Sequence, residues 1–275
     1  MDMQDKVWLW QYTWEDVSDY LSEKSTILIP IGSVEQHGKH LPLGVDALVA
    51  QRLAEDAAKK TGTLVAAPLW YGWAPQHMGF TGTVTLGSET LTKLGEDVIL
   101  SFIYHGFKRI VFVNGHRIAN LPPLQVATTR MRHQTGAYVG IVDPVFLGQN
   151  IHASLLNDAE SLGLSHAEGL ETAHMRYLFP DLVREHHVKR AESGSQPKLP
   201  WHVVDPFRPD DRVWTATTSE ELKNSAPTGA MGNPPWGTPE IGKRLHESLV
   251  DRFADFLSEL ENYPVTIRED IQYPV

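Results

Sequence analysis

Short apolar runs alternate with segments of helical periodicity over the first 143 residues, and this alternation strongly limits the possible folds. The runs typical of buried strands are residues 26–32, 64–68, 109–115 and 137–143. The helical segments are residues 46–62, 88–106 (with Ser88 as N-cap) and 124–136. Strands that alternate with helices favour a mainly parallel sheet covered on both faces. The sequence therefore predicts an α/β fold, a three-layer sandwich with helices flanking a central sheet.

The remaining residues alternate less regularly. Residues 165–179 are predicted as a helix with Ser165 as N-cap, and residues 238–263 as a long amphipathic helix. Residues 193–239 hold eight of the 18 prolines and three of the eight tryptophans. We expect this segment to be an ordered excursion, because long ordered loops often cover sites or join subunits. No repeat or domain break is visible, which predicts one domain over residues 1–275.

Composition argues against several partners and sites. The 24 basic and 34 acidic residues give a net charge of −10 without a basic run, so nucleic acid and anionic membranes are not expected partners. No run of 18 apolar residues is present, and the N-terminal "MDMQDKVWLW" lacks the apolar core of a signal peptide, so we expect a cytoplasmic protein. With no cysteine, a metal site must use histidines and carboxylates, which suit Zn²⁺, Mn²⁺, Fe²⁺ or Mg²⁺.

Two loops with potential metal ligands leave predicted strands at the same edge of the sheet. The stretch "GSVEQHGKHLPLGVD" (32–46) carries Glu35, His37 and Asp46, and "NGH" (114–116) carries His116. Sites in open α/β sheets lie outside the carboxyl ends of the strands, which favours a metal site here. Two structural alternatives stay open: Asp46 is also a good helix N-cap, and a single histidine after a strand is often only hydrogen-bonded.

A third polar group lies in "HAEGLETAH" (166–174). Glu171 and His174 are three residues apart on one helix face, and Glu-x-x-His is a recurring inward-facing pair in carboxylate metal sites. The alternative is an ordinary exposed face with ion pairs. Glycine-rich nucleotide-binding motifs and the Gly-x-Ser-x-Gly nucleophile motif are absent.

The stretch "IPIGSVEQHGKHLPLGVDALVA" closely resembles the signature of the creatininase family, Pro-x-Gly-x-x-Glu-x-His-Gly-x-His-x-Pro followed by Asp. Further similar segments follow in family order: "YGWAPQHMGFTGTVTL", "VNGH", "HAEGLETA" and "TGAMGNPPWGTPEIGK". The resemblance covers nearly the whole chain. It implies a two-metal hydrolase of a small molecule on an α/β sheet, commonly a homohexamer.

The resemblance also implies a ligand set. Glu35 and His116 would hold one metal and His37 the other, with Asp46 bridging the two. The two divalent ions per subunit would be Zn²⁺, Mn²⁺ or both, with Fe²⁺ also possible.

One family carboxylate is missing from this chain. In creatininase itself it follows two residues after the histidine of Asn-Gly-His, where this chain has Ile118. Glu171, in the Glu-Thr position, is the candidate to replace it. His166 matches the histidine implicated in proton transfer in creatininase, and is the predicted catalytic residue.

Departures from the family pattern concern the substrate. "NGHRIAN" replaces the common "NGHGGN" and puts Arg117 beside the metals, while Trp236 replaces a small residue. Arg117, which could bind substrate oxygens, is expected to contact the substrate together with His77 and Trp236. A surface salt bridge is the structural alternative for Arg117. Creatinine is therefore not the expected substrate.

The predicted reaction is attack of a metal-bridging hydroxide on a carbonyl of a small cyclic substrate, with His166 protonating the leaving atom. The expected bond is a cyclic amide or another non-peptide C–N bond. One alternative is C–C ring opening of a cyclic polyol diketone, as in the relative that acts on 3-dehydro-scyllo-inosose. A second alternative is a non-catalytic binding protein on the same scaffold.

Overall fold

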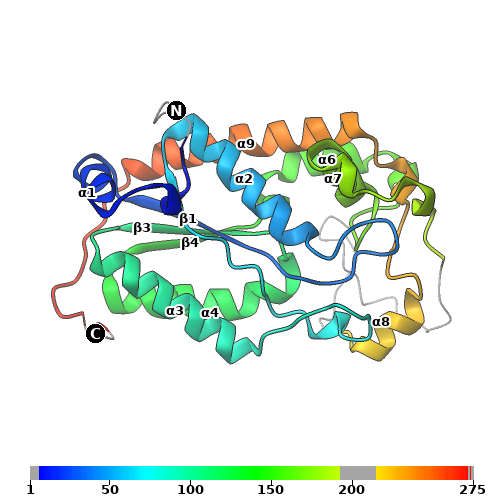
Figure 1. The fold of residues 1–275 in the computed structure, drawn as a ribbon, viewed down its shortest axis with the longest axis horizontal. Helices are drawn as coiled ribbons and strands as arrows, with labels where there is room; N and C mark the ends of the chain where they lie inside the picture. The colour runs from blue at the N-terminus through cyan, green and yellow to red at the C-terminus, as the bar shows by residue number, and fades with distance from the viewer. Residues whose placement is uncertain (1–5, 193–214, 272, 274–275) are drawn as a thin grey trace.

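The computed structural model describes residues 6–192, 215–271 and 273. Its centre is a four-stranded parallel sheet in the order β2-β1-β3-β4. Figure 1 shows β1, β3 and β4 between two layers of helices. The strands are β1 (Thr26–Ile31), β2 (Leu64–Val65), β3 (Arg109–Asn114) and β4 (Tyr138–Val142). The sheet confirms the predicted α/β class, although β2 has only two residues.

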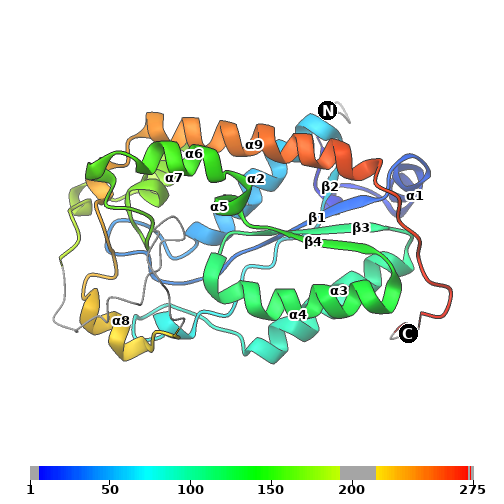
Figure 2. The ribbon, with the colours of Figure 1, turned by 180° about the vertical axis from the view of Figure 1, so that it is seen from behind.

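Helices cover both faces of the sheet. One face carries α2 (Val45–Thr61), α7 (Gly169–Leu178) and α9 (Pro239–Glu261), and the other carries α3 (Ser88–Tyr104) and α4 (Arg117–Thr135). The other helices are α1 (Trp14–Glu23), α5 (Pro144–Leu147), α6 (Gln149–Leu156) and α8 (Ser219–Ser225). Figure 2 shows α5 and α6 on the side of the sheet that α9 covers, in contact with that helix.

The two faces have separate cores because side chains alternate along a strand. Leu28, Val111 and Val113 pack with α2 and α9, around Phe253. The intervening strand residues, Phe112 among them, pack with α3 and α4. Strands buried on both faces have no polar alternation, which is why they read as continuous apolar runs in the sequence.

Three helix starts differ from the predictions. Helix α4 begins at Arg117 and not at residue 124; its internal Pro122 and Pro123 lack the N–H of a regular helix and disguise the first turns. Helix α3 has Gly87 as its N-cap, with Ser88 inside the helix. Helix α7 begins four residues after Ser165 and is capped by the Glu168 carboxylate, which accepts from two backbone N–H groups.

The Pro- and Trp-rich segment is described only in part. Trp201 and Trp214 lie outside the described residues, whereas α8 and the 3₁₀ turn Pro234–Trp236 lie within them. No helix in the described part of the chain is both long and apolar enough to cross a membrane.

Candidate active site

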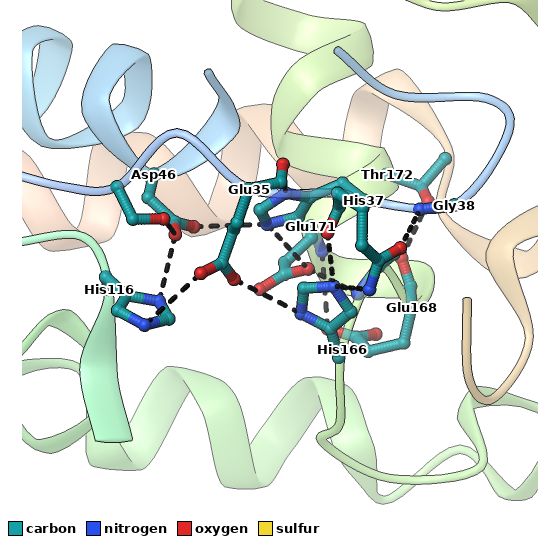
Figure 3. Close-up of polar contacts among 12 residues, drawn as sticks. Glu35, His37, Gly38, Asp46, His116, His166, Glu168, Glu171 and Thr172 are labelled. Atoms are coloured by element: carbon teal, nitrogen blue, oxygen red, sulfur yellow. Dashed lines mark hydrogen bonds and ion pairs between the residues drawn. The ribbon is translucent and has the colours of Figure 1, made fainter. Parts of the chain in front are cut away.

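Seven titratable side chains converge beyond the carboxyl ends of β1 and β3. We call them the seven-residue cluster: Glu35, His37, Asp46, His77, His116, His166 and Glu171. They come from the loops after β1 and β3, the first turn of α2, the 3₁₀ turn Pro75–His77, and the segment that enters α7. Figure 3 shows six of them, labelled, directed toward a common centre. All six residues predicted to bind metal or transfer protons lie in this cluster, together with His77.

Two glycines allow the start of α2 to approach the strand ends. A Cβ atom on Gly32 would lie 2.3 Å from the backbone nitrogen of Ala47, and one on Gly115 would lie 2.1 Å from the carbonyl oxygen of Asp46. Such distances are too short for any side chain. Gly32 ends the β1 run and Gly115 precedes His116, so these glycines bring Asp46 next to the loops that carry the other ligand candidates.

Asp46 lies between two imidazoles. Its Oδ1 is 3.2 Å from Nε2 of His37, and its Oδ2 is 3.0 Å from Nδ1 of His116. Oδ2 also accepts a hydrogen bond of 2.8 Å from the Ser33 hydroxyl. Gly44, not Asp46, is the N-cap residue of α2, so the alternative role of Asp46 as a helix cap is wrong.

Glu35 is fully buried and lies between two other histidines. Its Oε1 is 3.2 Å from Nε2 of His77, and its Oε2 is 3.3 Å from Nε2 of His116. Oε2 of Glu35 and Nε2 of His116 are buried atoms without a hydrogen bond in the described structure. Buried polar atoms are normally satisfied, so this pair needs a ligand between or beside them. Together with Asp46 they form one donor group whose atoms lie within 4.8 Å of one another, which fits a divalent cation.

Glu171 forms the other end of the cluster. Its Oε2 is 3.8 Å from Nε2 of His37 and accepts a 2.6 Å hydrogen bond from the backbone of Ala167. Ala167 has a φ of 49°, in the left-handed region that non-glycine residues rarely adopt. This backbone conformation places His166 and Glu171 on the same side, and both form a second donor group with His37.

His166 packs against two other imidazoles. Its ring centroid is 4.5 Å from that of His37 and 4.4 Å from that of His77. Its Nε2 lies 2.7 Å from the backbone carbonyl of Gln36, while Nδ1 lies 3.8 Å from Oε1 of Glu35. Nδ1 is therefore the nitrogen directed at the cluster.

Burial and the alternation of acids and imidazoles shift the pKa values strongly. Burial, only partly offset by His116, raises the pKa of Glu35 to about 7. Burial opposes charge on His37 and His116, but the adjacent carboxylates outweigh it and raise their pKa values to about 10 and about 9. Burial and the charge on His37 lower the pKa of His166 to about 3. Without a metal, His37 and His116 are thus cationic near neutral pH and His166 is neutral.

Metal uptake should therefore release protons. Metal ligation requires neutral imidazoles, so Zn²⁺ must displace the protons of His37 and His116. We expect release of about two protons per chain at pH 7.5, and an apparent affinity that rises about tenfold per pH unit for each proton up to their raised pKa values. Calorimetric titration of metal-free protein in buffers of different ionisation enthalpy measures this number. Release of less than about half a proton would contradict the assignment.

Arg117 and Trp236, which were predicted to contact the substrate, have partners outside the cluster. Nε of Arg117 is 3.1 Å from Oδ2 of Asp143, and its guanidinium lies over the exposed ring of Phe146. Nε1 of Trp236 donates to Asp158. Arg117 follows His116 directly in the sequence, but neither Arg117 nor Trp236 contacts the cluster through these interactions.

His174 does not join the cluster either. It turns instead to His246 of α9, with 2.9 Å between Nε2 of His174 and Nδ1 of His246. The pairing of Glu171 with His174 as metal ligands is therefore wrong, although both lie on α7 as predicted. The sequence analysis predicted no role for Gln36 and Ser33. Ser33 donates to Asp46, and Gln36 lies within hydrogen-bond distance of His77 and His166. Their position inside the "GSVEQHG" stretch was the available signal.

Comparisons with known proteins identify the family of this chain. The family model Creatininase, described as creatinine amidohydrolase, matches residues 10–257. The chain is 28% identical to a 3-dehydro-scyllo-inosose hydrolase of Thermotoga maritima, over 96% of this chain and 87% of the relative. It is 27% identical to a creatinine amidohydrolase of Pseudomonas putida, over 94% of this chain and 98% of the relative.

A solved structure described as creatininase with Mn has the same fold. It superposes with a TM-score of 0.75 at 24% identity, covering 94% of this chain and all of the other. Because the family model spans most of the sequence, the chain belongs to the creatininase family of metal-dependent hydrolases.

Proposed function

We propose that this protein uses two divalent cations, Zn²⁺, Mn²⁺ or both, with Fe²⁺ also acceptable, to hydrolyse a non-peptide C–N bond in a small cyclic substrate. The observation that carries the proposal is the position of Asp46 between His37 and His116, with one carboxylate oxygen directed at each. A carboxylate that directs one oxygen toward each of two imidazoles has the arrangement needed for a bridging ligand once metal displaces the imidazole protons. Family membership and the orphaned atoms of Glu35 and His116 support it.

The residues divide into two ligand sets that share Asp46. Glu35, His116 and Asp46 form one donor group and would hold one cation. His37 would hold the other together with Asp46 and Glu171, the two carboxylates nearest its Nε2. When bound, the cations lower the pKa of water and polarise a carbonyl group. Glu171 thus supplies the carboxylate that Ile118 cannot.

His166 is the residue proposed to move the proton. In the metal-free protein its imidazole is uncharged at neutral pH, because burial and the charge on His37 lower its pKa to about 3. Its Nε2 is occupied by the carbonyl oxygen of Gln36, so Nδ1, which is directed at the cluster, is the nitrogen proposed to accept the proton of the attacking water and to deliver it to the leaving atom as the substrate bond breaks. Contacts with the rings of His37 and His77 restrict the movement of this imidazole between the two transfers.

Substrate contacts are proposed for Arg117, His77 and Trp236. Nε of Arg117 is paired with Asp143, and its guanidinium lies over the ring of Phe146. A guanidinium held by one edge in this way can offer its other edge to substrate oxygens. Nε2 of His77 lies 3.2 Å from Oε1 of Glu35, inside the cluster. Trp236 packs against the start of α7 and would act at the rim of the site.

Ring opening by C–C hydrolysis is the second candidate. It is favoured by the similarity, over 96% of this chain, to the 3-dehydro-scyllo-inosose hydrolase, and by Arg117, which suits a polyhydroxylated substrate. The same carbonyl attack serves both reactions, and the leaving atom is nitrogen in one and carbon in the other.

A paired screen separates the two reactions. Metal-free protein is loaded with Zn²⁺ or Mn²⁺ and assayed against a set of cyclic amides and a set of cyclic polyol ketones. We expect metal-dependent hydrolysis of cyclic amides that is lost with a chelator and restored by metal. Turnover confined to the ketones would replace the first candidate by the second. A protein that takes up no metal would be the non-catalytic scaffold instead.

We further propose that the chain acts as a homo-oligomer, a hexamer by family resemblance. The exposed rings of Trp10 and Trp14 are apolar surface of the kind that subunit contacts cover. Light scattering of the purified protein measures the number of subunits, and a monomer would contradict this proposal.

A further inference from the structure

The buried side chain of Gln36 lies between the two histidines that the ligand sets leave out. Its Nε2 is 3.0 Å from Nδ1 of His77 and 2.9 Å from Nε2 of His166. It is also 3.2 Å from the carbonyl oxygen of Gly229. Gly229 has a φ of 86°, and a Cβ there would lie 1.9 Å from Oε1 of Gln36. Glycine is therefore required for the amide to fit.

Backbone groups decide how the amide is oriented. Oε1 of Gln36 lies 2.9 Å from the backbone N–H of Gly38, which can only donate, so Oε1 is the acceptor. Nε2 then faces the carbonyl of Gly229, which can only accept, and uses one of its two protons there. One amide proton remains for a histidine.

A second backbone group assigns the proton on His166. Nε2 of His166 lies 2.7 Å from the carbonyl oxygen of Gln36, and a carbonyl cannot donate. Nε2 of His166 must therefore carry a proton, and it cannot accept the remaining proton of the amide. That proton goes to Nδ1 of His77. A neutral His77 that accepts at Nδ1 carries its own proton on Nε2, which faces Oε1 of Glu35 at 3.2 Å.

We propose that Gln36 is a positioning residue that sets the Nε2–H tautomer of two histidines, that of His77 through its side-chain amide and that of His166 through its backbone carbonyl. Because the rings are oriented differently, His77 presents an N–H donor to the site and His166 a free Nδ1. The two rings thus have different tasks although they pack against each other. His166 receives protons at Nδ1. His77 holds Oε1 of Glu35, or a substrate oxygen in its place, through Nε2–H.

The described residues form three groups of possible metal ligands, and the distances within these groups do not distinguish them. The proton positions do. The group of Glu35, His77 and His166 has ligand atoms within 4.8 Å of one another, as the other two groups do. A nitrogen that carries a proton cannot ligate a cation, so His77 is not a metal ligand while Gln36 holds it. For its catalytic consequence, this inference rests on the proposed function; the tautomers themselves do not.

Neutron diffraction tests the proposal directly, because it locates deuterium on nitrogen. Crystals of the full chain at neutral pD, metal-free and loaded with Zn²⁺ alone, should show deuterium on Nε2 of both His77 and His166 and none on either Nδ1. Deuterium on Nδ1 of His77, or zinc bound to His77, would overturn the proposal. If no zinc binds, the two-metal function fails, while the metal-free crystal still decides the tautomers.

The variant Gln36→Glu tests whether Gln36 sets the tautomer. A carboxylate accepts and does not donate, so deuterium should appear on Nδ1 of His77. An unchanged His77 in this variant would show that Gln36 does not set its proton. The control is Gln51→Glu on α2, where the native side chain donates to the backbone of Ala47. It introduces the same charge and should leave both tautomers and the metal content unchanged.

Discussion

The variant Asp46→Asn should fold and bind almost no metal. Asp46 is the only residue of the cluster placed to serve both cations, with one oxygen near His37 and the other near His116. An amide has the same shape but no charge. Loss of even an outer-shell partner costs about 10–100-fold in metal affinity, so we expect at least about a 100-fold loss at both sites together. Hydrolysis should fall with it.

Elemental analysis after equilibration with excess Zn²⁺ measures this effect, with circular dichroism to verify folding. The matched control is Asp56→Asn on the same helix. Asp56 also accepts from an imidazole, that of His246, at 3.0 Å, but lies outside the cluster. The control should retain its metal. An Asp46→Asn protein with the metal content of the native chain would exclude the bridging role.

The variant His166→Gln should keep its metal and lose turnover. Glutamine can still donate to the carbonyl of Gln36, but it cannot accept and return a proton at the position of Nδ1. Positioned general acid–base groups contribute about 10²–10⁴-fold, so kcat should fall by that factor while KM changes little. Steady-state kinetics with metal analysis on the same sample tests both parts.

The result also distinguishes two roles for His166, because it forms a donor group with His37 and Glu171. Loss of one metal ion per chain in His166→Gln would make it a ligand and not the proton carrier. Replacement of the exposed His186 by Gln is the control for loss of a histidine, and we expect no change in kcat or metal content.

The sequence predicted the sheet and the meeting of its polar loops because these follow from local rules. Continuous apolar runs marked β1 and β3, and the carboxyl ends of adjacent parallel strands share one edge. These two rules are enough to predict that Glu35 and His116 lie close together. The ligand roles themselves came from the motif around Glu35 and stay predictions until metal is measured.

The features that the sequence did not predict depend on contacts between distant segments. The pairing of Arg117 with Asp143 joins the start of α4 to the residue after β4. His174 has the right spacing to accompany Glu171, but α9 packs on α7 and supplies His246 as its partner. The alignment of Gln36 with two histidines needs Gly229, nearly 200 residues away. No local pattern contains this information.

The orphaned atoms of Glu35 and His116 link metal supply to the survival of the fold itself. Each is buried by folding and lies 3.3 Å from the other without a hydrogen bond, so the metal-free native state carries a desolvation cost that the unfolded chain does not. An ion that binds only the native state adds about 2.7 kcal/mol of stability per site when its free concentration is 100 times Kd. In a cell short of metal, the chain would therefore be unfolded and degraded more often, and the protein itself would become scarce along with its activity.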